Sequence, residues 1–145
     1  MHYAGYANEV GGYVNQPSAE QNHVFGGEVV DLTRDKQQAA AWGAAASGVE
    51  ARIRAALTGG APPATLDRLT VRLERVEREL LVAAGLPGRP WFRHQIYAPG
   101  VNSGDGTQLL PGINDALFLR NNTDEARHYA RTLAESLRAA AATLG

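Results

Sequence analysis

The clearest secondary-structure signal lies in residues 66–84, which read LDRLTVRLERVERELLVAA. Leucine, valine and alanine recur in this stretch at steps of three and four residues, whereas arginine and glutamate fill most of the other positions. This spacing places the apolar side chains on one face of an α-helix. Gly85 follows directly and Pro87 comes two residues later, and both are typical helix-stop signals. We therefore expect an amphipathic helix over 66–84.

Helical periodicity also occurs on both sides of this stretch. An alanine-rich segment, 28–57, carries one apolar stripe and ends at the turn sequence TGGAPP, 58–63. Residues 3–14 repeat tyrosine, alanine and valine at helical steps, but their glycines favour only a short helix docked on something larger. Residues 15–27 contain a proline and paired glycines, a composition typical of a loop. The C-terminal segment, 123–144, has a second strong stripe of alanine and leucine.

Residues 85–111 have no helical period, since they hold four prolines and five glycines. Aromatic side chains in this segment indicate a loop that is partly packed down rather than disordered. A short helix is expected over 113–119, and Thr123 is expected to cap the last helix. No segment shows convincing strand alternation. The sequence predicts an all-α domain over 1–145: a bundle of three long and two short helices with one long ordered loop, about 85–111.

Composition excludes several classes of protein. The 145 residues are 44% hydrophobic and 20% charged, values typical of a chain that folds around a core. A net charge of -1 provides no sequence-wide field for nucleic acid or an anionic membrane, and no apolar stretch is long enough to insert into a bilayer. The absence of cysteine excludes disulfides, thiol catalysis and zinc–thiolate sites.

Motifs of catalysis are missing as well. None of the four histidines lies three to five residues from another, and neither HExxH, GxSxG nor a phosphate-binding loop occurs. We therefore expect no catalytic residue and no metal ligand. Arg93 and His94 differ from the other polar residues because aromatic side chains surround them. Two interpretations stay open for this pair: Arg93 anchors the loop by bonding its carbonyls, or the pair faces a substrate in a larger assembly.

Two runs of sequence, GLPGRPWFRHQIYAP (85–99) and LPGINDALF (110–118), carry a specific family pattern. They resemble the C-terminal helical domain of the glutamate carboxypeptidase II and transferrin receptor family, the transferrin-receptor-like dimerisation domain. About fifteen positions match in order and with the same spacing, and weaker similarity extends over essentially the whole chain. The resemblance implies a structural role for the motif residues Gly85, Leu86, Pro87, Arg89, Pro90, Pro99, Pro111 and Gly112.

The resemblance implies a homodimerisation module that belongs to a larger, metallopeptidase-like protein. Two zinc ions would lie in a separate peptidase domain that has no counterpart in this chain, so the chain alone would be inert. In this family the loop after IYAP reaches the partner peptidase domain and helps to line its substrate pocket. The corresponding residues of this chain are Arg93, His94, Tyr97, Gly104 and Asp105.

Two of these positions differ from the family's carboxypeptidases. Gly104 and Asp105 stand where a Lys-Tyr pair senses a glutamate side chain, and neither residue can make a charge-assisted bond to a carboxylate. An aminopeptidase-like or other specificity is therefore implied as readily as one for glutamate.

Two alternatives and one expectation about the interface complete the interpretation. The chain is also interpretable as a small stand-alone hydrolase using Arg93, His94 and Asp105, or as a domain of a receptor-like homologue with a dead peptidase domain. For the dimer, alanine- and leucine-rich stripes on two or three helices can exceed what one small bundle buries. We expect the last helix and the helix over 66–84 to form the interface.

Overall fold

The computed structural model describes residues 3–101 and 106–145. Its predominantly helical fold confirms the predicted all-α class. The helices are α1 (Tyr3–Phe25), α2 (Thr33–Thr58), α3 (Pro63–Glu79), α4 (Pro111–Asn114), the π-helical turn η1 (Asp115–Leu119) and α5 (Thr123–Leu144). Between α3 and α4, strands β1 (Tyr97–Pro99) and β2 (Thr107–Leu109) pair antiparallel, with Tyr97 opposite Leu109.

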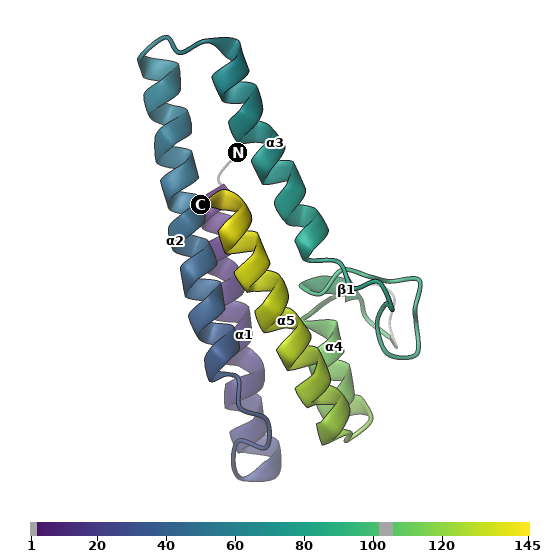
Figure 1. Ribbon diagram of the computed structural model, residues 1–145. Coiled ribbons are helices and arrows are strands. Elements are labelled where there is room, and N and C mark those ends of the chain that lie inside the picture. The colour runs from purple at the N-terminus through teal and green to yellow at the C-terminus, as the bar shows by residue number, and fades with distance from the viewer. Residues whose placement is uncertain (1–2, 102–105) are drawn as a thin grey trace.

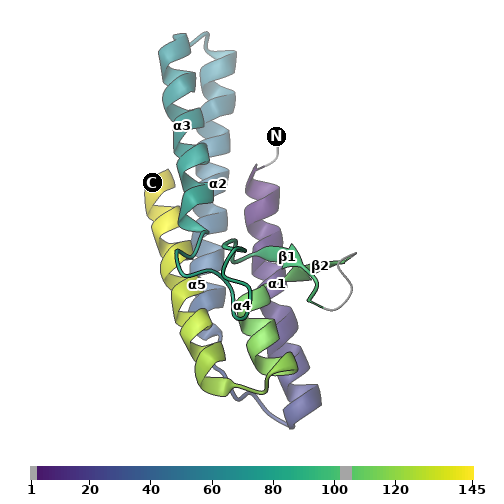
Figure 2. The ribbon, with the colours of Figure 1, turned by 90° about the vertical axis from the view of Figure 1, so that its right-hand side faces the viewer.

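Helices α2 and α5 lie side by side in the middle of the bundle (Figure 1). Helix α1 packs against α2, and α3 packs against α5. The view from the side shows α1 and α3 at opposite edges of the molecule, with the β1–β2 hairpin projecting away from the helices (Figure 2). In both views the ends of α2 and α3 that meet in a turn extend beyond the beginning of α1 and the end of α5.

The core is centred on Trp42 of α2, which is fully buried. The rings of Tyr3 and Tyr6, from α1, meet the Trp42 ring edge to face at centroid distances of 6.0 and 5.7 Å. Such contacts add to the free energy gained by burying large aromatic surfaces. The apolar stripe of α5 also faces this core, and its buried members are Ala126, Ala130, Leu133, Ala134, Leu137, Ala140 and Leu144.

The prediction for the N-terminal region was wrong, because α1 continues to Phe25 instead of giving way to a loop over 15–27. Pro17 lies inside the helix and is buried together with Val14 and Ser18. The helix ends only at Gly26, whose φ of 72° is a left-handed conformation that glycine adopts without strain. Burial of one continuous face has overridden the proline and glycine signals.

Gln21 shows why polar residues in this region do not form a loop. Its side-chain oxygen accepts hydrogen bonds from the backbone N–H groups of Val29 (3.0 Å) and Val30 (2.7 Å), and its amide donates to the Val30 carbonyl (3.2 Å). The side chain is fully buried. Ser18 donates to Glu28 at 2.8 Å in the same way. The polar side chains of α1 thus hold the turn that follows it, where their hydrogen bonds compensate for burial.

Other helix boundaries also differ from the prediction. Helix α2 begins at Thr33 rather than at residue 28, and α3 runs from Pro63 to Glu79 rather than from 66 to 84. The pattern beyond Glu79 stays apolar, but the backbone there pairs with the central loop instead of continuing the helix. Asn122, not Thr123, caps α5, since its side chain accepts from the Glu125 N–H at 3.0 Å. The two three-residue strands were not predicted either.

Asp35, in the first turn of α2, is a buried carboxyl group that is only partly compensated. It is 2% exposed, and its Oδ1 has no hydrogen-bond partner among the described residues. Burial raises the pKa of Asp35 to about 7, against the opposing effects of a hydrogen bond from its own backbone and of the Arg34 guanidinium, and Asp31 adds a smaller increase. Loss of hydration disfavours the ionised form of a carboxyl group.

Asp35 is therefore expected to destabilise the fold as the pH rises. Because its pKa is higher in the folded than in the unfolded chain, the folded state binds the proton more tightly. The free energy of unfolding should increase as the pH falls from 8 to 5, by about 2 kcal/mol relative to Asp35→Asn. Urea unfolding of both proteins across this range measures the difference. Equal pH dependence in the two proteins would contradict the assignment.

Candidate functional site

The candidate site is the central segment between α3 and α4, which backbone hydrogen bonds fold onto the end of α3. Val82 donates to the Arg93 carbonyl at 2.8 Å, and Gln95 donates to the Leu80 carbonyl at 3.0 Å. Gly85 makes the turn possible: its φ is 75°, and a Cβ atom there would collide with the Pro90 carbonyl. The described part of this segment, up to residue 101 and again from residue 106, is therefore packed down as its aromatic residues predicted.

Arg89 is the side chain that ties this loop together. Its guanidinium donates to Asp115 of η1 at 2.8 Å and to the carbonyl of Pro99 at the end of β1. Arg89 and Asp115 are 7% and 0% exposed, so the ion pair is buried. The guanidinium also lies 5.5 Å from the centre of the Phe92 ring. One side chain thus connects the turn after α3, the hairpin and the π-helical turn.

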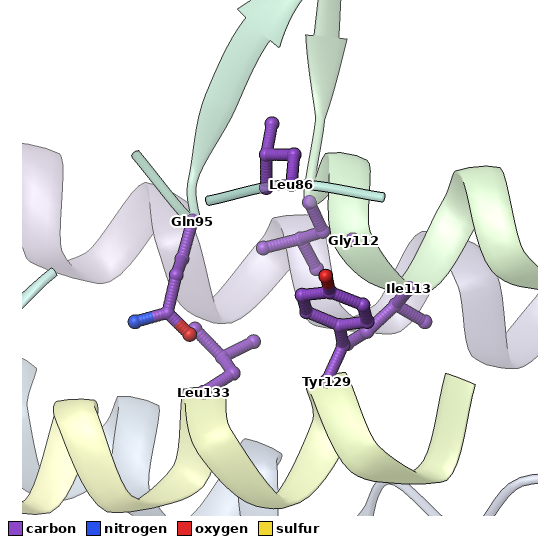
Figure 3. A pocket seen from close by; sticks show the side chains of 7 residues that line it. Leu86, Gln95, Gly112, Ile113, Tyr129 and Leu133 are labelled. Carbon is purple, nitrogen blue, oxygen red and sulfur yellow. The ribbon is translucent and has the colours of Figure 1, made fainter. Parts of the chain in front are cut away.

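Two further side chains attach the loop to α5. Tyr129 donates its hydroxyl proton to the Gly85 carbonyl at 3.2 Å, and the Gln95 amide donates to the Ser136 hydroxyl at 2.7 Å. Figure 3 shows Tyr129 beneath Gly112, where a Cβ atom would lie 2.6 Å from the Tyr129 ring. The cavity among these residues measures about 10 Å³. This space fits at most about one water molecule and is far too small for a substrate.

His94 and Tyr97 are brought together, as a structural pair. Their rings stack at a centroid distance of 4.2 Å. The His94 Nδ1 accepts from the Ile96 N–H at 3.2 Å, which leaves Nε2 to carry the proton, 3.6 Å from the Glu77 carboxylate of α3. The imidazole is therefore held between α3 and β1, and the contacts it makes orient the start of the hairpin.

Among the described arginines, the one that bonds a carbonyl of this loop is Arg89, which donates to Pro99; the anchoring role considered for Arg93 stays an interpretation. The Arg93 side chain is exposed, and no hydrogen bond or ion pair of its guanidinium occurs within 3–101 and 106–145. Trp91 and Tyr97 are exposed on the same loop, by 70% and 45%. Gly104 and Asp105, the positions compared with a Lys-Tyr pair, lie outside the described residues.

The motif residues for which the resemblance implied a structural role differ in burial. Gly85, Leu86, Arg89, Pro111 and Gly112 are buried, whereas Pro90 and Pro99 are exposed and Pro87 lies between these classes.

Asp115, Tyr129 and Glu77 were missed by sequence reasoning. The available signal for Asp115 was its position as an acidic residue within the mostly apolar run LPGINDALF, where burial is expected.

Neither a metal site nor a catalytic set is assembled in the part of the chain that is described. Within residues 3–101 and 106–145, no group of three or more His, Asp or Glu side chains could hold a metal ion. Among the described helices, none combines the length and the apolar composition needed to cross a membrane. The described site is an anchored loop with exposed aromatic and cationic side chains, an arrangement suited to contact with another surface.

The comparison with known proteins agrees with this geometry. A family model described as "Transferrin receptor-like dimerisation domain" matches residues 30–145. An inactive zinc metalloprotease of Schizosaccharomyces pombe is 38% identical over 72 residues, which are 50% of this chain and 9% of that protein. A probable glutamate carboxypeptidase of Arabidopsis thaliana is 32% identical over 76 residues, 52% of this chain and 11% of that protein. The match thus covers only about a tenth of each relative's own length.

Removal of the Arg89 guanidinium should lower the free energy of unfolding far more than removal of the Arg93 guanidinium. Arg89→Met leaves the Asp115 carboxylate buried without a counter-charge, which we expect to lower the free energy of unfolding by about 3–5 kcal/mol. Arg93→Met, the matched control at an exposed position, should change it by less than about 0.5 kcal/mol. Urea denaturation measures both. Similar losses in the two variants would refute the assignment of Arg89 as the anchor.

Proposed function

Because the chain belongs to the transferrin receptor-like dimerisation domain family, we propose that it is the homodimerisation module of a glutamate carboxypeptidase-like protein. The family match over residues 30–145 is the observation that carries this proposal. The relatives include proteins named as probable glutamate carboxypeptidases and one named as an inactive zinc metalloprotease. The larger protein is accordingly either a zinc peptidase or a catalytically dead homologue, with any zinc held by a separate peptidase domain.

The second part of the proposal concerns the central loop, which faces the peptidase domain and helps to line its substrate pocket. Exposed apolar and cationic groups on a firmly attached loop support this role. Trp91, Tyr97 and Val101 are 70%, 45% and 52% exposed, and the Arg93 guanidinium lies among them in sequence. Exposed aromatic residues and arginine are typical of the buried centre of a protein interface.

Assembly rather than catalysis is the role proposed for this chain by itself. The family match is to a dimerisation domain and covers no peptidase domain. Of the side chains proposed for a stand-alone hydrolase, Arg93 is exposed, and His94 stacks on Tyr97 with its Nε2 3.6 Å from the Glu77 carboxylate, so these two do not form a nucleophile with a base. The remaining candidate, Asp105, is outside the described residues.

The mass of the chain in solution tests the dimerisation proposal. We expect light scattering on a sizing column to give twice the chain mass of 15.5 kDa at micromolar concentration, with dissociation on dilution. A single 15.5 kDa species up to high micromolar concentration would overturn the proposal that this chain carries self-association by itself.

The hydrolase alternative makes the opposite prediction for activity. We expect the purified chain to show no turnover of a dipeptide library, with or without added Zn²⁺. Turnover that is abolished by His94→Ala, while the melting curve stays unchanged, would establish the alternative. An exposed-site variant such as His128→Ala serves as the matched histidine control.

A further inference from the structure

Helices α2 and α3 extend beyond the rest of the bundle to the turn that joins them (Figures 1 and 2). A groove is lined by side chains of both helices in this region. Its volume is about 470 Å³. Ile53 and Leu57 of α2 and Leu73 of α3 form apolar walls, and Tyr3 closes the end nearest α1. The groove therefore continues the apolar interior of the bundle past the beginning of α1.

The apolar side chains of α2 change abruptly from buried to exposed between the bundle core and the groove. Trp42, Ala46 and Val49, which lie beside α1 and α5, are fully buried. Two turns further on, Leu57 is 64% exposed although it lines the groove. No described element of the chain covers it. At roughly 25 cal/mol per Å² of apolar surface, covering such side chains favours association.

Charged side chains stand along both rims of the groove. On α2 these are Glu50 and Arg54. The Glu50 carboxylate already accepts a hydrogen bond from the Ala4 N–H at 2.8 Å, whereas Arg54 takes part in no ion pair with the described residues. Thr70 lines the α3 rim, and Asp67 and Glu74 stand three residues before and four residues after it, so helical geometry places them along the same rim. Both acids are exposed, and neither takes part in an ion pair with the described residues. A partner for this groove should present acid opposite Arg54 and base opposite Glu74.

A second copy of the chain satisfies this requirement in one orientation. A twofold axis parallel to the helices places α2 of one copy opposite α3 of the other, so that Arg54 meets Asp67 and Glu74 twice. A twofold axis perpendicular to the helices would instead place Arg54 opposite Arg54. Rim charges contribute little affinity in water but select the orientation of the partner.

We propose that the α2–α3 groove is the self-association surface, in which two α2–α3 hairpins pack parallel and cover each other's Ile53, Leu57 and Leu73. This inference rests on the proposed function and specifies its interface. The interface expected from sequence consisted of α3 and α5. The proposed interface keeps α3 but has α2 in place of α5, because the apolar stripe of α5 is already covered inside the chain.

Leu57→Glu tests the surface, with Val71→Glu as the matched control. Val71 is exposed on the same hairpin but does not line the groove. Light scattering over a dilution series should show at least a tenfold weaker dimer for Leu57→Glu and an unchanged dimer for Val71→Glu. If Leu57→Glu leaves the dimer unaffected, the groove is not the interface, although the chain still dimerises. If the unmodified chain is a monomer, both the proposed dimerisation and the proposed interface are overturned.

Two further variants test the orientation. Arg54→Glu should weaken the dimer, and Arg54→Glu combined with Glu74→Arg should restore it, because the charges again alternate across the interface. Failure of Arg54→Glu to weaken the dimer, or of the added Glu74→Arg to restore it, would overturn the parallel arrangement.

Discussion

The buried ion pair between Arg89 and Asp115 is the interaction on which the central part of the molecule depends. These residues are separated by 26 positions, and the loop between them contains the hairpin and the exposed aromatic side chains. Transfer of either charge into the interior alone would be strongly unfavourable. The pair therefore forms only when the loop folds onto η1, and the additional bond to the Pro99 carbonyl fixes the hairpin in the same step. Three described parts of a proline- and glycine-rich segment, the turn after α3, the end of β1 and η1, are held together in this way.

The parts of the fold that could be predicted from sequence are those in which local pattern and burial agree. The helix over 66–84 and the C-terminal helix have strong apolar stripes, and both occur as α3 and α5. The loss of helical period after residue 84 and the aromatic residues that follow also predicted the packed loop, as its described part shows. The end of α3 was predicted five residues too late, because Leu80 is fully buried at the C-cap of the helix, and the residues after it pair with the central loop instead of continuing the helix.

Other features depend on contacts between distant residues, which periodicity does not reveal. Gln21 appeared to belong to a polar loop, yet its amide satisfies three backbone hydrogen bonds of a turn eight and nine residues away. Arg93 and Arg89 are both arginines in the same motif, and only the position of Asp115 decides which one is buried. Similarly, the stripe of α5 indicated surplus apolar surface, whereas α2 and α3 pack along it and leave the surplus at their own outer ends.

The place of α1 in the core has a consequence for how the limits of this module are understood. The family match begins at residue 30, after α1 has ended. Even so, Tyr3 and Tyr6 supply two of the rings around Trp42, and Val10 and Val14 are fully buried. The recognisable part of the sequence is thus shorter than the cooperative folding unit. A protein trimmed to the family boundary would present the Trp42 side of α2 to water, and its behaviour would reflect a broken core rather than the properties of the module.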